Sequence, residues 1–328
     1  MILVNETSLP AALLSTVIDD DRIAASVLVR VTYRLEKRAG GALEIDAEQP
    51  WLVSGAPQKT AYGTMEAETP FVKGGVDLFL FGAARAPGKV PVSQLEVTMR
   101  VGDFVRRASV FGERLWLRKN GKQLEASRPG VFVEMPLVPA NAFGGAVTWD
   151  GLEVPFMENP AGKGFCIAEE EAEGRSLPNL EEPGSPMTAW NAQPVVCGFG
   201  FCPAANTARF RNGWEMNDAQ TELAAVRPAS LNTAFPPMIA PQARPGDAVH
   251  IEGVDHDGPV TFALPEPPAA VRLSFGATEV TRIPTIDQVG VLVDERRVFV
   301  TYRFPFRYVV RPREKRGIHL IARGVTSP

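Results

Sequence analysis

Histidine and cysteine are scarce in this chain, with three of each in 328 residues. The histidines, His250, His256 and His319, all lie in the last quarter of the sequence. A serine or cysteine nucleophile needs a base such as histidine beside it, and no Gly-x-Ser-x-Gly segment is present. The sequence therefore favours a protein that is not an enzyme and that uses no cofactor.

Three cysteines are also too few for a disulfide framework, which indicates a reducing compartment. Cys197 and Cys202 lack the second cysteine pair of a zinc ribbon. One other group has metal-ligand side chains close together in sequence: His250, Glu252, Asp255 and His256. A surface hairpin explains that group equally well, so we expect buried thiols and no metal.

An excess of basic residues and a long apolar run are both absent. The net charge is −4 and the isoelectric point is about 5.6, which argues against nucleic acid as a ligand. No apolar stretch approaches the roughly 18 residues of a membrane-spanning helix. Residues 1–16 contain Asn5, Glu6 and Pro10, where a signal peptide needs an unbroken apolar core. We expect a cytoplasmic protein that contacts neither nucleic acid nor membrane.

Proline and glycine, in contrast, are abundant. With 29 of each, they form about 18% of the chain, where about 12% is usual. Because neither residue suits the interior of a helix, we expect many short elements joined by turns.

The clearest strand signal is a hairpin. From Gln94 to Val101 apolar and polar residues alternate without exception, and residues 104–111 return after the two-residue turn Gly102-Asp103. Further strand patterns are predicted at residues 27–35, 76–81, 248–254, 260–264, 270–275, 288–293 and 297–308. Short strands without intervening helices predict a mainly β fold, an antiparallel sandwich or barrel-like sheets with long irregular loops.

The middle of the chain lacks strand patterns and separates two strand-rich parts. Residues 138–203 lose all periodicity and become rich in glycine, proline and aromatic residues. Residues 214–226 are the one predicted helix, and a proline-rich linker is predicted at residues 227–246. We therefore expect an N-terminal β-rich domain (1–226) that contains the loop region 138–203, and a C-terminal β subdomain (247–328). In its last strand, Arg303 and Arg307 are expected to face outward.

A series of short motifs begins before the loop region and continues into it. It comprises residues 112–116 (Gly-Glu-Arg-Leu-Trp), 135–137 (Met-Pro-Leu), 142–145 (Ala-Phe-Gly-Gly), 158–165 (Glu-Asn-Pro-Ala-Gly-Lys-Gly-Phe) and 177–181 (Leu-Pro-Asn-Leu-Glu), with residues 70–73 (Pro-Phe-Val-Lys) upstream. This series resembles a family of uncharacterised-domain proteins encoded in bacterial type VI secretion gene clusters, beside genes for a VgrG spike and a toxin. The resemblance covers nearly the whole chain.

That resemblance implies a non-enzymatic adaptor or chaperone, whose partners are a secreted toxin and a VgrG-type spike protein. The residues that we expect to bind these partners are those of the motifs: Arg114, Trp116, Phe143, Gly144, Gly145, Asn159, Pro160, Gly162, Phe165 and Asn179. Two alternatives stay open. Trp116 and Phe143 are equally suited to be core residues that fix the loops, and the protein is alternatively an all-β hydrolase or carbohydrate-binding module with an acidic cleft.

Overall fold

A computed structural model describes residues 1–36, 43–121, 123–203 and 231–323. The predicted helix at 214–226 and the first residues of the predicted linker lie outside these ranges. In the described residues the chain is mainly β, as predicted, and its helical segments are single 3-10 turns at Pro87–Lys89, Pro139–Asn141, Glu169–Glu171 and Pro236–Met238. None of the described helices is long and apolar enough to cross a membrane.

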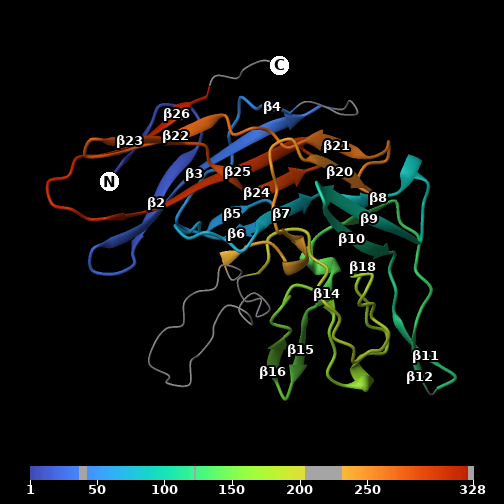
Figure 1. Cartoon of the computed structure of the whole chain (residues 1–328). Coiled ribbons are helices and arrows are strands. Elements are labelled where there is room, and N and C mark those ends of the chain that lie inside the picture. Colours follow the sequence, from blue (N-terminus) through green and yellow to red (C-terminus); the bar gives the residue numbers. More distant parts are fainter. Residues whose placement is uncertain (37–42, 122, 204–230, 324–328) are drawn as a thin grey trace.

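The largest sheet runs through the middle of the molecule (Figure 1) in the order β19-β7-β24-β25-β3-β2, with β4 also paired to β3. Its strands are β2 (Ala11–Val17), β3 (Arg22–Leu35), β4 (Leu43–Ile45), β7 (Val76–Phe81), β19 (Ile239–Ala240), β24 (Thr285–Leu292) and β25 (Arg297–Val309). The strand β7 is buried along its whole length, as its largely apolar sequence predicts, and its one charged residue, Asp77, is buried with the rest. The strand predicted at residues 27–35 is part of β3, and both of its faces are covered, because residues 24–33 are all buried, including the polar Ser26, Arg30 and Thr32.

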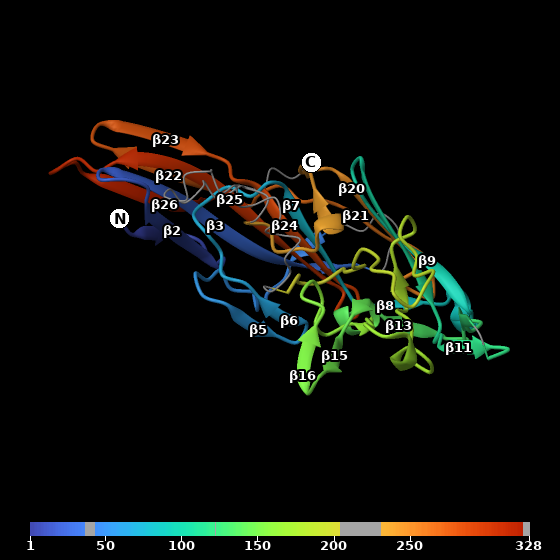
Figure 2. The same cartoon turned by 90° about the horizontal axis from the view of Figure 1, so that it is seen from below.

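Two further sheets extend the structure in opposite directions (Figure 2). A four-stranded sheet comprises β1 (Leu3–Asn5), β22 (Ala269–Phe275), β23 (Thr278–Arg282) and β26 (Arg316–Ala322). A five-stranded sheet comprises β9 (Gln94–Val101), β10 (Phe104–Phe111), β18 (Leu180–Glu181), β20 (Ala248–Glu252) and β21 (Val260–Ala263). The predicted hairpin of β9 and β10 is confirmed, and Gly102 has the positive φ of 53° that its turn requires.

Strands from both sides of the predicted linker pair in the same sheets. The late strand β20 pairs with β9, and β25 pairs with β3 along the whole length of β25. Most strand pairs are antiparallel, but β7 and β24, β1 and β26, and β14 and β17 pair in parallel. Each of the three sheets has free edges in the described part of the chain, so the strands form packed open sheets.

The remaining strands form short pairs: β5 (Gln58–Thr60) with β6 (Gly63–Met65), β8 (Ala83–Arg85) with β13 (Glu134–Pro136), β11 (Trp116–Lys119) with β12 (Gln123–Ala126), β14 (Phe143–Gly144) with β17 (Lys163–Gly164), and β15 (Ala146–Trp149) with β16 (Leu152–Pro155). Three of these pairs, β11–β12, β14–β17 and β15–β16, lie in a part of the chain that extends away from the sheets (Figure 1). We call this part, residues 112–190, the loop module.

Candidate functional site

The loop module has a second cluster of buried hydrophobic residues beside the larger core that the three sheets share, and Phe156 packs against both. Its buried members are Trp116, Leu124, Phe143, Val147, Phe165, Cys166, Ala172, Leu177 and Met187. The aromatic rings of Phe143 and Phe165 both pack against Phe156, with centroid distances of 4.9 and 5.4 Å. A stretch without sequence periodicity is therefore held in place by packing around a few large side chains.

Asn159 organises the centre of this module. Its side-chain Nδ2 donates to the carbonyl oxygens of Pro139 and Phe143 at 2.8 and 3.0 Å, and the side chain is fully buried. Its own carbonyl oxygen accepts from the backbone N–H groups of Gly145 and Gly162 at 2.9 and 3.1 Å. Two motifs that are separate in sequence are thereby joined by one residue.

The glycine motifs follow from this arrangement. A Cβ atom on Gly144 would lie 2.1 Å from the carbonyl oxygen of Asn159, and the residue has a φ of +146°. A Cβ on Gly162 would lie 2.5 Å from Nδ2 of Asn159. Only glycine fits at both positions, because backbone and amide atoms occupy the space of a side chain.

Arg114 and Asn179 join the module to β10. The Arg114 guanidinium donates to Glu181 Oε1 at 2.5 Å and to the Pro178 carbonyl oxygen at 2.6 Å, and it lies 4.1 Å from the ring centroid of Phe111. Asn179 Nδ2 donates to the carbonyl oxygen of Phe111 at 3.0 Å. These contacts fix the module against the edge of the five-stranded sheet.

The structure thus brings the predicted partner-binding residues together, but mostly inside the module. Trp116 and Phe143 are each 1% exposed, and Asn159 and Asn179 are fully buried. Arg114, Gly144 and Phe165 are buried, Gly145 and Gly162 are half-buried, and Pro160 is exposed. Burial is what the alternative structural role requires, and direct partner contact by these residues stays a prediction.

The exposed apolar side chains of the module lie elsewhere, and two large ones meet at the tip of the β15–β16 hairpin. Trp149 and Leu152 face each other across the strand pair and are 58% and 70% exposed. Val147, two residues before Trp149, is buried in the module core. The hairpin extends past that core, so the face that is covered at Val147 is open to solvent at its tip.

This hairpin was missed in the sequence, although it carries a strong signal. Asp150 and Gly151 form its two-residue turn with φ values of 48° and 77°, and Asp-Gly is a preferred pair for such turns. Alternating apolar residues flank the turn on both sides. Interpreting residues 138–203 as wholly irregular hid this short alternation.

Ionisable groups gather at a different place, on the large sheet. Six charged side chains form a buried cluster of three cations and three anions: Arg30, Lys73, Arg303, Glu68, Asp77 and Asp287. Arg303 donates to both oxygens of Asp287, at 2.7 and 3.1 Å. The prediction that Arg303 faces outward is wrong, because its guanidinium is 2% exposed and pairs inside the fold.

Lys73 stands among the three carboxylates of this cluster. Its Nζ lies 2.8 Å from Asp77, 3.3 Å from Asp287 and 3.6 Å from Glu68. Burial opposes the charge on Lys73, but the three carboxylates outweigh burial and raise the pKa of the ammonium group. Burial likewise opposes ionisation of Asp287, and Lys73 and Arg303 outweigh it and lower the pKa of that carboxyl. The cluster is charge-balanced and closed to solvent, so each charge depends on its partners inside the fold, and the cluster is not placed to meet a substrate.

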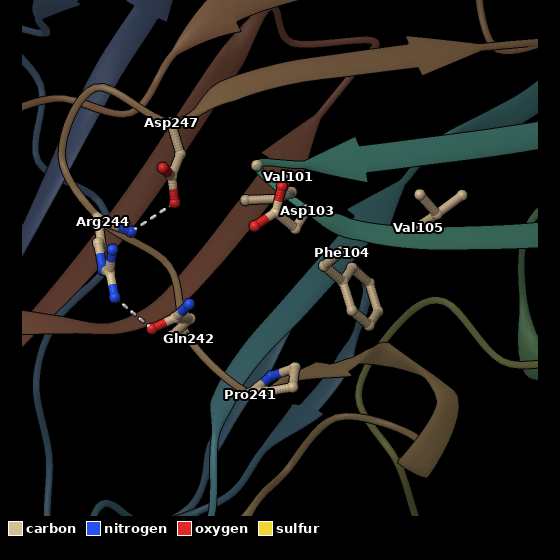
Figure 3. A pocket seen from close by; sticks show the side chains of 9 residues that line it. Val101, Asp103, Phe104, Val105, Pro241, Gln242, Arg244 and Asp247 are labelled. Carbon is tan, nitrogen blue, oxygen red and sulfur yellow. Dashed lines mark hydrogen bonds between the residues drawn. The ribbon is translucent and has the colours of Figure 1, made fainter.

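A surface pocket of about 340 Å³ lies beside the turn of the β9–β10 hairpin (Figure 3). Arg244 donates to Gln242 Oε1 at 2.7 Å on one wall, and Phe104 lies opposite (Figure 3). Asp103 and Asp247 are its carboxylates, and its lining holds no histidine, cysteine, serine or lysine. The pocket therefore offers no serine, cysteine or lysine nucleophile beside a histidine, and its two carboxylates are the only groups in its lining that the acidic-cleft alternative could use.

The candidate metal ligands do not converge. His250 Nε2 lies 3.1 Å from Glu252 Oε1, whereas His256 turns to the Ala86 carbonyl oxygen and to Glu134. In the residues that the structure describes, no three histidine, cysteine or acidic side chains are grouped to hold a metal ion. The three cysteines are buried as expected, and burial raises the pKa of the Cys197 thiol to about 12.

Comparison with known proteins places the chain in a family. Neither the search of curated proteins nor that of solved structures found a match. A family model described as an uncharacterized protein conserved in bacteria matches residues 20–303, a range that covers most of the large sheet and all of the five-stranded sheet and the loop module. The chain therefore belongs to this bacterial family, DUF2169.

Proposed function

We propose that the protein is a non-enzymatic adaptor, or chaperone, that binds a type VI secretion effector and helps to load it onto a VgrG-type spike. The observation that carries the proposal is the exposed pair Trp149 and Leu152 at the tip of a projecting hairpin. Large aromatic residues in this setting supply much of the binding energy of protein interfaces.

The support beneath the hairpin suits such a role. The module has its own buried cluster, and Arg114 and Asn179 join it to a sheet by hydrogen bonds between buried groups. A rigid support lowers the entropy that is lost when a loop binds its partner. The motif series of the sequence supports the choice of an effector and a spike as partners.

The test is direct binding to the products of neighbouring toxin and spike genes. We expect the purified chain to bind the toxin, and the double variant Trp149→Ala, Leu152→Ala to bind it at least about 30-fold more weakly, which corresponds to about 2 kcal/mol. A matched control is Leu117→Ala, which truncates a 50% exposed residue on the β11–β12 hairpin and should leave binding unchanged.

Stability measurements separate contact from folding. The hairpin variant should keep the thermal midpoint of the wild type, since its side chains are exposed. Phe143→Ala should lower the free energy of unfolding by about 3 to 5 kcal/mol, because it removes a fully buried ring. Unchanged toxin binding by the hairpin variant would reject the hairpin as the contact, and a wild-type chain that binds neither toxin nor spike would reject the adaptor.

A further inference from the structure

The strand β2 leaves one row of backbone hydrogen-bonding groups unused. Its register with β3 places Leu14 opposite Ser26, and the carbonyl oxygen of Pro10 accepts from the N–H of Arg30 at 3.0 Å. In an antiparallel pair such bonds recur at every second residue, so the even-numbered residues of β2 bond to β3. The backbone groups of the odd-numbered residues point away from β3, and within the described ranges none of them has a hydrogen-bond partner.

Several other free strand edges of the three described sheets are protected. Beyond the end of β24, the free edge of β25 carries Pro305 and Arg307 at the positions that point outward. Proline has no N–H to offer, and charged residues discourage strand addition. The edge strand β23 carries Glu279, and the edge strands β19, β18 and β21 are only two to four residues long.

The strand β2 has none of these protections. Its seven residues, Ala11–Val17, include no charged residue and no proline. Ser15 is exposed, and Val17 is 67% exposed. A long uncharged strand edge of this kind is a template for pairing with another strand.

We propose that β2 pairs with β2 of a second copy of this chain, antiparallel about a two-fold axis at Leu14. In this register Ala11 lies opposite Val17 and Leu13 lies opposite Ser15. Each residue with unpaired backbone groups therefore faces another such residue of the second copy. The pairing forms about eight backbone hydrogen bonds and joins the two large sheets into one.

The charges around β2 favour the antiparallel arrangement. Three aspartates, Asp19 to Asp21, follow the strand in the turn to β3. Antiparallel pairing places the two acidic turns at opposite ends of the joined strands, about 40 Å apart at 3.4 Å per residue. That separation is several times the screening length of about 8 Å at physiological salt, whereas parallel pairing in register would place the turns side by side.

The oligomeric state of the full chain tests the proposal. Sedimentation equilibrium should show a dimer at micromolar concentration, and Ser15→Lys should weaken dimerisation at least about 10-fold. The two introduced lysines would lie on either side of the axis, about 7 to 8 Å apart. The matched control is Thr281→Lys, which adds the same charge to an exposed position of the β23 edge and should leave the dimer intact.

A cysteine cross-link tests the register. Leu14→Cys places two thiols across the axis, at the short Cα separation of a pair without hydrogen bonds, where a disulfide can form. Ala12→Cys places them four residues out of line and should not cross-link. The three native cysteines are buried and give no background. Any of three results would overturn the proposal: a wild-type chain that stays monomeric to about 100 μM, a dimer that survives Ser15→Lys, or equal cross-linking by both cysteine variants. The monomeric result is also the one expected if the β2 edge pairs with a different protein.

Discussion

The large sheet and the loop module both bury polar groups, but the groups differ in charge. Six charged side chains pair with one another at the sheet, whereas the centre of the module is held by the neutral amides of Asn159 and Asn179, and the ion pair of Arg114 with Glu181 lies where the module joins β10. Ionised groups lose more hydration on burial than amides do, so each charge depends strictly on its partners. We therefore expect that removing one charged side chain lowers the free energy of unfolding of the whole fold more than removing one amide does.

The largest expected effect comes from breaking the charged cluster. Lys73→Met leaves three buried carboxylates facing two guanidinium groups, and we expect the free energy of unfolding to fall by about 3 to 5 kcal/mol. Urea unfolding of the variant measures this loss. The control Lys119→Met breaks an ion pair between side chains that are 64% and 48% exposed, and it should have a much smaller effect. Equal losses in the two variants would contradict the comparison.

A smaller loss is expected in the module. Asn159→Ala removes the hydrogen bonds to the carbonyl oxygens of Pro139 and Phe143 and should lower the free energy of unfolding by about 1 to 3 kcal/mol. Hydrogen exchange should show the lost protection within residues 112–190, while β3 and β7 keep theirs. Loss of protection in β3 and β7 as well would show that the module and the sheets unfold as one unit.

The dependence of stability on acid pH tests the charged cluster of the large sheet. Asp287 has a lowered pKa in the folded protein, so the folded state binds protons less readily than the unfolded state. Its contribution to stability is complete above the usual aspartate pKa of about 3.9 and is lost as the pH falls below that value. Denaturant unfolding between pH 7 and pH 3 should show this decline, and Asp287→Asn should flatten it. An equally steep decline in that variant would assign the acid sensitivity to other carboxylates.

The smallest expected change in stability concerns the exposed hairpin. Trp149→Ala should alter the free energy of unfolding by no more than about 0.5 kcal/mol, because the ring is 58% exposed. Thermal and urea unfolding both measure this. A loss above about 2 kcal/mol would mean that the Trp149 ring packs within the fold, and it would remove the basis for treating the tip as a binding surface.

Much of the sheet structure can be predicted from sequence, because strand formation there follows local patterns. The alternation at residues 94–101, the strand at 76–81 and the turn Gly102-Asp103 all appear as expected. Such signals depend only on residues that are close in sequence.

The charged cluster and the centre of the module could not be predicted in this way. Arg30 and Thr301 are 271 residues apart, and Arg303 looks like a solvent-facing strand residue until Asp287 and Glu68 are placed beside it. The glycines at 144 and 162 signal tight geometry, but the sequence does not show that Asn159 is the residue that causes it. Long-range pairing decides these features, and no local pattern encodes the partners.

The pairing of β3 with β25 has a consequence for how the chain folds during synthesis. Their contacts join residues about 270 positions apart, and at 5 to 20 residues per second a ribosome needs about 14 to 54 seconds to make the intervening chain. Until then β3 has only β2 and β4 as sheet neighbours, and the backbone groups on its other side, where β25 later pairs, have no partner strand. The nascent protein is therefore most exposed to misassociation early in synthesis, and its last strands complete the sheet that its first strands begin.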